Sequence, residues 1–306
     1  MKRTVKKNID VLGLGCAAVD DIIYVESFPA PDSKTRVQRR LRRFGGLTGN
    51  ALIAAARLGA RCAYAGCVGT DILSADVEQN FRREGIDTSH APRLPDAGVI
   101  HSTVIIGQDT GSRNVFYEVH GMVGAHPLLP ADEVIRETNV LFIDQYGMEG
   151  NLRALEKARS FAVPVVADFE DDAVPHFREV LAAVDHLILA EDFAFRITGE
   201  PKPAEAARAL WHDKRAAVIV TCGRSGCWAV AKDAGNRPRH HGTFPVRAAN
   251  TNGCGDVFHG AYAFRLACGD SLEKRIQFAS AAAAVKARQS EIPSLRAVKL
   301  MLQKKW

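Results

Sequence analysis

The sequence has no uninterrupted apolar run near the ~20 residues that a membrane-spanning helix needs, and its basic first residues are not followed by a signal-peptide apolar region. Its seven cysteines cannot all pair and include no Cys-x-x-Cys spacing, which argues against zinc and against a disulfide scaffold. Lys and Arg exceed Asp and Glu by only five, too few for strong attraction to nucleic acid or anionic lipid. We therefore expect a cytoplasmic protein with reduced cysteines that binds neither nucleic acid nor membrane.

What the sequence does have is material for a core, since 47% of its 306 residues are hydrophobic. Short apolar runs alternate with helix-favouring stretches, which is typical of parallel strands joined by crossover helices. This pattern predicts an α/β fold. Four of the runs are short enough for neighbouring strands of a buried parallel sheet, namely Val140–Ile143, Val163–Ala167, His186–Leu189 and Val218–Thr221.

Other segments are placed by their local signals. Ala51–Leu58 and Ser74–Arg83 have helix-favouring composition and stop close to glycines, and Ala63–Val68 between them reads as one buried strand. Strand-like segments within about 20–45 and 99–120 fall outside the alternating pattern and are predicted to join as a small lid sheet. With no repeat and no Ser/Gly-rich linker, residues 1–306 are expected to form one domain.

The segment with the clearest chemical meaning is Asn250–Asp256, which opens a predicted helix. Gly253, Cys254 and Gly255 leave backbone N–H groups and the positive end of the helix dipole accessible to an anion. Asp256 follows in the first turn, where its carboxylate could accept a proton from a hydroxyl that attacks a bound phosphoryl group. The alternative is an ordinary Gly-rich helix start whose aspartate stabilises the dipole.

A second motif favours the chemical interpretation. Gly45-Gly46-Leu47-Thr48-Gly49-Asn50 leads directly into the predicted helix Ala51–Leu58. With both motifs present, the chain resembles the ribokinase-like, or PfkB, family of carbohydrate kinases over almost its whole length. That family has a Gly-Gly motif followed by Asn near its N-terminus and an Asp-Thr-x-Gly-x-Gly-Asp signature near its C-terminus. The resemblance implies a three-layer α/β/α sandwich with a mostly parallel sheet, and an ATP-dependent sugar kinase that uses Mg²⁺.

The resemblance also implies roles for individual residues. Asp256 would be the catalytic base, and Gly253, Cys254 and Gly255 would form the anion hole. The sugar would be bound by Asp20, Gly45, Gly46 and Asn50, whose carboxylate and amide groups suit vicinal hydroxyls. Thr221, Gly223 and Gly226 match the segment of the family that approaches the nucleotide.

Three positions depart from the family pattern. Asn250 replaces the first aspartate of the signature, which helps ribokinases hold a monovalent cation, so potassium activation is not expected to carry over. Ala190–Phe193 lacks the Asn-x-x-Glu motif tied to magnesium, which leaves the metal ligands unassigned, although Glu191 or Asp192 could substitute. Residues 287–293 lack the glycine that is common near the adenine pocket.

Several further residues have both a functional and a structural interpretation. Cys254 at a helix N-terminus should have a lowered thiol pKa, and His259 could reach the site or simply pack. Asp144 follows a strand, where it could line the cleft. The acidic residues Asp168, Glu170, Asp171 and Asp172 could hold magnesium through water or form a solvated loop, and Lys34, Arg36, Arg40, Arg43 and Arg113 could face an anionic acceptor or solvent.

The sequence therefore predicts phosphorylation of a hydroxymethyl group of a ribose- or ketohexose-like monosaccharide, including an anionic one. Residues Val257–Ala261 are similar to kinases of ketose-like sugars, including the sulfofructose kinase type. The alternatives are a nucleoside kinase, with Tyr24, Phe28 or Phe44 as a platform for the base, and a non-catalytic sugar or nucleotide sensor. An exposed edge of the lid sheet also favours a homodimer.

Overall fold

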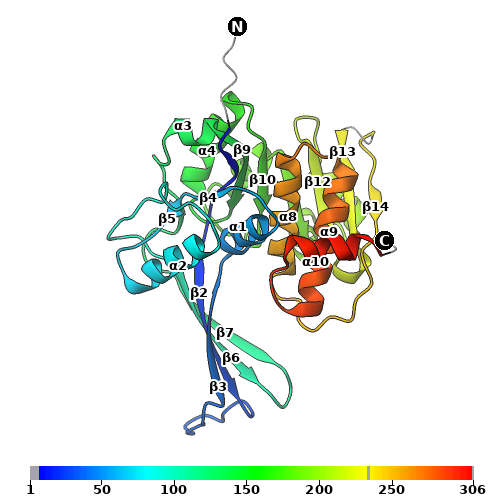
Figure 1. Ribbon diagram of the computed structural model, residues 1–306. Helices are drawn as coiled ribbons and strands as arrows, with labels where there is room; N and C mark the ends of the chain where they lie inside the picture. The colour runs from blue at the N-terminus through cyan, green and yellow to red at the C-terminus, as the bar shows by residue number, and fades with distance from the viewer. Residues whose placement is uncertain (1–6, 233–234, 305–306) are drawn as a thin grey trace.

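A central sheet of eight strands runs through the molecule (Figure 1). The computed structural model describes residues 7–232 and 235–304. Six neighbouring strands are parallel, and two antiparallel strands continue the sheet at one edge. In spatial order these are β4 (Cys62–Tyr64), β1 (Ile9–Leu14), β9 (Thr138–Asp144), β10 (Val165–Asp168), β11 (His186–Ala190), β12 (Ala217–Thr221), β13 (Cys227–Ala231) and β14 (Arg239–His241).

Helices cover both faces of this sheet, because its strands are apolar on both sides. Consecutive residues point to opposite faces, so Val140 packs into one core and Leu141 into the other. The core on the first face takes residues from α1 (Leu47–Arg57), α2 (Ile72–Arg83), α8 (Cys254–Ala267), α9 (Leu272–Gln289) and α10 (Leu295–Leu302). The core on the second face takes residues from α3 (Asp132–Arg136), α4 (Met148–Ser160), α5 (Phe177–Ala183), α6 (Glu191–Thr198) and α7 (Pro203–Leu210). The predicted three-layer fold is confirmed.

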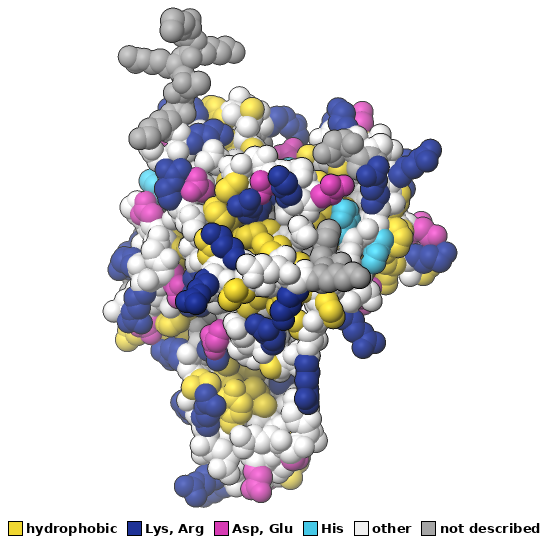
Figure 2. All heavy atoms as spheres, turned by 45° about the vertical axis from the view of Figure 1, so that its right-hand side comes forward, with side chains coloured by type: hydrophobic (Ala, Val, Ile, Leu, Met, Phe, Trp, Pro, Cys, Tyr) yellow, Lys and Arg dark blue, Asp and Glu magenta, His cyan; other side chains and the backbone are white. Residues whose placement is uncertain are grey.

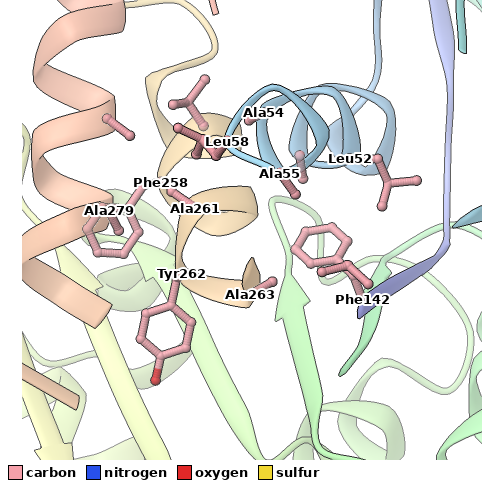
Figure 3. Close-up of a cluster of buried hydrophobic side chains, with 14 of the residues drawn as sticks. Leu52, Ala54, Ala55, Leu58, Phe142, Phe258, Ala261, Tyr262, Ala263 and Ala279 are labelled. Carbon is pink, nitrogen blue, oxygen red and sulfur yellow. The ribbon is translucent and has the colours of Figure 1, made fainter. Parts of the chain in front are cut away.

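The packing of α1 against α8 brings the two sequence motifs together. Figure 3 shows Leu58, the residue after α1, beside Ala261 of α8, and Leu52 and Ala55 of α1 above Phe142 of the sheet. Gly260 allows this close approach, since a Cβ there would lie 2.0 Å from the Ala51 carbonyl oxygen. The starts of the two helices, distant in sequence, are therefore held by one buried cluster.

A second sheet of four strands projects from the body (Figure 1). It consists of β3 (Arg39–Gly45), β2 (Ala18–Val25), β6 (Ile100–Gly107) and β7 (Arg113–Glu118), in that spatial order, and we call it the lid sheet. β2 pairs parallel to β6, while both outer strands are antiparallel to their neighbours. The prediction that these segments form a small separate sheet is confirmed.

One predicted strand is divided in two. The sequence favoured a single strand at Ala63–Val68, but β4 ends at Tyr64 and β5 (Gly66–Cys67) begins two residues later. β4 pairs with β1, whereas β5 turns away to pair with β8 (Gly124–Ala125). A continuous apolar run does not reveal such a change of partner.

In the described part of the chain, no helix combines the length and apolarity needed to span a bilayer. All seven cysteines are free thiols, five of them buried.

Candidate active site

The candidate site lies where α8 begins, beyond the carboxyl ends of β10 and β11. His259, in the second turn of α8, contacts Asp168 at the end of β10 and the Ile188 carbonyl of β11. Gly253, the residue before α8, has φ +73, a left-handed conformation that glycine adopts easily. The first turn of α8 therefore faces the edge of the sheet at which α/β proteins bind ligands.

Asp256 in that turn is held by a residue of the other motif. Nδ2 of Asn50, on α1, donates a hydrogen bond of 2.6 Å to Oδ2 of Asp256. Asp256 is half-buried, and desolvation raises its pKa to about 7, with the charge of Asp168 adding to the rise and the Asn50 bond opposing it. A carboxyl group with a pKa near neutrality can exchange protons at physiological pH.

The predicted anion hole is available only in part. The first N–H groups of a helix have no intrahelical acceptors, which is why this turn can bind an anion. The Cys254 N–H, however, already donates to the Thr251 carbonyl at 3.2 Å. A Cβ on Gly255 would meet nothing within 4 Å, so the approach to this turn is open.

Asp20, the predicted sugar-binding carboxylate, lies on β2 near Gly45 and Asn50. A Cβ on Gly45 would lie 3.1 Å from Asp20 Oδ2 and 3.7 Å from Asn50 Nδ2, so this glycine separates the two polar groups without filling the space. Burial raises the pKa of Asp20, while a hydrogen bond from Ser102 opposes that rise. The residues predicted to bind the sugar are thus brought together.

A cavity of about 350 Å³ adjoins these groups. Its walls combine polar residues of the body and of the lid sheet with apolar residues of the lid sheet. Figure 2 shows hydrophobic side chains gathered on the lower, projecting part of the molecule and basic side chains spread over the same face. The body contributes Asn50, Asn252, Gly253 and Lys286, and the lid sheet contributes Asp20, Ile22, Tyr24, Phe44, Val104 and Ile106.

Of the basic residues named from the sequence, Arg43 and Arg113 line the cavity, joined there by Arg42. Lys34, Arg36 and Arg40 are exposed and lie outside its lining. Arg42 is committed elsewhere, because it donates to both carboxylate oxygens of Asp21 at 2.9 Å. Arg43 likewise pairs with Glu291 at 3.0 Å.

Asp144 supports the site rather than lining the cavity. It is fully buried, and its Oδ2 accepts hydrogen bonds from the Cys16 N–H at 2.8 Å and the Thr48 hydroxyl at 2.8 Å. These bonds join the end of β9, the turn after β1 and the start of α1. A Cβ on Gly15 would lie 2.3 Å from the same oxygen, so only glycine fits at this position of the turn. Its position after a strand was enough to suggest from the sequence that Asp144 lies near a site. The sequence did not indicate that it supports the site through hydrogen bonds.

The predicted nucleotide segment forms a tight turn at the end of β12, outside the lining of this cavity. The Cys222 N–H donates to the Gly226 carbonyl at 2.8 Å. A Cβ on Gly226 would lie 2.1 Å from the His241 carbonyl oxygen, while one on Gly223 would meet nothing. Thr221 pairs in register with Ala190, which precedes α6. Segment 190–193, which lacks the Asn-x-x-Glu motif of the family, therefore lies next to this turn.

Of two side chains near α8, Cys254 differs from its sequence interpretation, and His259 follows the packing alternative. The expectation of a lowered Cys254 pKa is wrong: desolvation raises the thiol pKa, and the nearby Lys286 ammonium only partly opposes this. His259 is buried, with Nδ1 2.8 Å from the Gly255 carbonyl and Nε2 3.0 Å from the Ile188 carbonyl. It therefore braces the first turn of α8 from below.

The chain is similar to known proteins in sequence and in fold. A model of the pfkB family of carbohydrate kinases matches residues 6–293. The chain therefore belongs to this family, and within it to the sugar kinases of the ribokinase type.

Individual relatives agree with that assignment. The chain is 26% identical to a ribokinase of Haemophilus influenzae over 292 residues, covering 92% of this chain and 94% of the relative. It is 30% identical to mouse ribokinase over 240 residues, covering 73% and 71%. Among solved structures, the ribokinase of Thermotoga maritima matches with a TM-score of 0.83 at 24% identity, covering 97% and 100%. The Arabidopsis thaliana ribokinase, complexed with ribose and ATP, matches with 0.85 at 20%, covering 97% and 99%.

Proposed function

We propose that this sugar kinase transfers the γ-phosphoryl group of ATP to a hydroxymethyl group of a ribose- or ketohexose-like monosaccharide. The observation that carries the proposal is the hydrogen bond between Asn50 and Asp256. It joins the two motifs at a cavity that is large enough for a monosaccharide. The ribokinase relatives, one of them solved with ribose and ATP, support both substrates.

In this proposal the sugar is oriented by the polar end of the cavity. Asp20 accepts hydrogen bonds from two hydroxyls, and Asn50 contributes its amide between Asp20 and Asp256. The apolar lid residues exclude water around the sugar, which protects ATP from hydrolysis. An anionic acceptor remains within the proposal because Arg113 lines the same cavity.

Asp256 then acts as the general base. Its ionised carboxylate accepts the proton of the attacking hydroxyl while the hydroxyl oxygen forms a bond to the γ-phosphorus. The bond between that phosphorus and the bridging oxygen of ADP breaks in line, and ADP leaves with the electron pair. The amides of Gly253 and Gly255, with the dipole of α8, stabilise charge on the transferring group; Cys254 contributes if its bond to Thr251 opens.

Magnesium fits this site as a companion of the nucleotide. In the described residues no group of three or more His, Cys, Asp or Glu side chains is arranged to hold a metal. Mg²⁺ in kinases needs only one or two carboxylates beside substrate phosphates and water. Asp168 and Glu170, whose charges already act on Asp256, would hold it. When bound, it neutralises phosphate charge.

Thr221, Gly223 and Gly226 are proposed to approach the nucleotide through their backbone. Their turn follows a parallel strand of the sheet at the edge where ligands bind. We also propose a homodimer, as we did from the sequence, because the outer strand β7 of the lid sheet is exposed.

A nucleoside kinase is the second candidate, since Tyr24 and Phe44 both line the cavity where a base could stack. A sensor without turnover is disfavoured by Asp256, because ligand binding alone does not need a base.

The experiment is acceptor-dependent ADP release with Mg·ATP across pentoses, ketohexoses, anionic sugars and nucleosides. Mass spectrometry and ¹H–³¹P correlation NMR of the product locate the phosphate. A phosphate on a primary hydroxyl of a monosaccharide supports the proposal. Turnover confined to nucleosides would replace it with the second candidate, and binding without turnover would favour a sensor.

A further inference from the structure

Lys286 on α9 is a buried lysine beside the predicted anion hole. Lys286 is only 7% exposed, and its Nζ donates a hydrogen bond of 2.7 Å to the carbonyl oxygen of Asn252. Its Cε would lie 3.8 Å from a Cβ built on Gly253, and both residues line the cavity. The ammonium group is therefore next to the loop that begins α8.

The same end of α9 holds this loop at two more points. The carbonyl of Ala287 accepts hydrogen bonds from the Ala249 N–H at 2.8 Å and the Asn250 N–H at 3.1 Å. With the Lys286 bond, three contacts fix residues 249–252 against α9. The position of the charge relative to the first turn of α8 is consequently well defined.

The charge of Lys286 lacks a direct counter-ion. Among the described residues, no carboxylate lies within 4.0 Å of Nζ. Four groups act on it at longer range: Cys254 and Asp256 from α8, Glu291 after α9, and Arg43 from β3. Glu291 is itself paired with Arg43. An ammonium taken out of water without a paired anion is costly, and burial accordingly lowers the pKa of Lys286.

An anion in the site would remove that cost. An ammonium group has three N–H donors, and Asn252 accepts one of them. In phosphoryl transfer, negative charge spreads over the equatorial oxygens of the transferring group. The α8 amides supply only partial charges there, whereas Lys286 carries a full one.

We infer that Lys286 is a further catalytic residue, which binds the transferring phosphoryl group at the start of α8 while its bond to Asn252 holds the loop. This inference rests on the proposed function, since it places the phosphoryl group where Asp256 acts. It adds no covalent step. It assigns to α9 a role that neither sequence motif contains.

The test uses the full chain with Mg·ATP and the best neutral acceptor from the panel. Lys286→Ala and Lys286→Met should each lower kcat by about 100-fold, the usual loss for one donor to a developing oxyanion. The KM for the sugar should change little, because the lysine acts on the phosphoryl group. Methylamine should restore part of the Lys286→Ala rate. Lys299→Ala, at an exposed position on α10, is the control and should leave the rate unchanged.

The outcomes separate this inference from the proposed function. If Asp256→Asn abolishes turnover and the Lys286 variants keep the wild-type kcat, the inference is wrong and the proposed function stands. A higher sugar KM at constant kcat would make Lys286 an acceptor-binding residue and also contradict it. Lys286→Met keeps the apolar stem, and thermal unfolding of each variant identifies a loss that comes from misfolding. In that case methylamine rescue of the residual Lys286→Ala activity decides, and its absence counts against the inference.

Discussion

At the scale of residues, Asp256 is set apart by its surroundings. Its pKa is raised to about 7 by desolvation and by the charge of Asp168, while the Asn50 amide lowers it. A base works only when it is ionised, and a pKa near the working pH gives the best compromise between ionisation and basicity. The site therefore has the electrostatics that general-base catalysis requires.

This leads to a prediction about pH. Because protonated Asp256 cannot accept a proton, kcat/KM for the sugar should rise about tenfold per pH unit below about 7 and level off above it. Initial rates across a constant-ionic-strength buffer series measure this profile. Asn50→Ala removes the hydrogen bond that favours the ionised carboxylate of Asp256. The rising part of the kcat/KM profile of this variant should therefore move to higher pH. A profile that is flat from about pH 5 to pH 8 would rule out Asp256 as the base.

The site residues that can be identified from the sequence are those that stand within a recognisable motif. Asp256 and Asn50 stand beside paired glycines, and the motifs alone are enough to single out both. Lys286 carries no such signal, because it is a single lysine in an alanine-rich helix, and only the fold brings it to Asn252. The error at Cys254 has a similar cause. The helix dipole is visible in the sequence, but the desolvation that outweighs it is not.

At the scale of elements, the start of α1 controls the site. Gly46 precedes this helix with φ +85, and a Cβ there would lie 2.8 Å from both the Cys16 carbonyl oxygen and the Ala17 Cα. Asn50 is in the first turn of α1, so a shift of this start moves the amide that holds Asp256. Gly46 is thus needed for packing, in addition to the sugar-binding role that is proposed for it.

Gly46→Ala should therefore destabilise the protein and impair the site together. We expect a loss of about 3 kcal/mol in the free energy of unfolding, from the left-handed backbone and the collision combined. Gly85→Ala is the matched control, because Gly85 has φ +74 with nothing within 4 Å of the added Cβ. It should cost only about 1 kcal/mol and leave activity intact. Urea denaturation and sugar KM measure both effects, and equal losses in the two variants would contradict this account.

The elements themselves were largely predictable, and the exceptions have physical reasons. The four strands β9 to β12 were predicted because they are apolar on both faces, which only a sheet covered by helices requires. The break between β4 and β5 was missed because both pieces are buried and apolar, and the change of partner depends on β8 far along the chain.

At the scale of the whole molecule, the structure joins two parts with different tasks. The layered body aligns strand ends and helix starts, which brings Asn50 to Asp256 and Lys286 to Asn252. The lid sheet adds the apolar wall of the cavity through Ile22 and Val104. Both parts could be predicted from their strand patterns, but not the full lining of the cavity, since it comes from segments distant along the chain.

Asp256 is proposed to be the base that makes this family member an active sugar kinase. The most direct measurement is sugar-dependent ADP release by the wild type and by Asp256→Asn, with sugar affinity measured in both by calorimetry. We predict that the variant binds sugar but turns over about 10²- to 10⁴-fold more slowly, as expected for loss of a general base. Comparable rates in the two proteins, with product formed in both, would contradict the account.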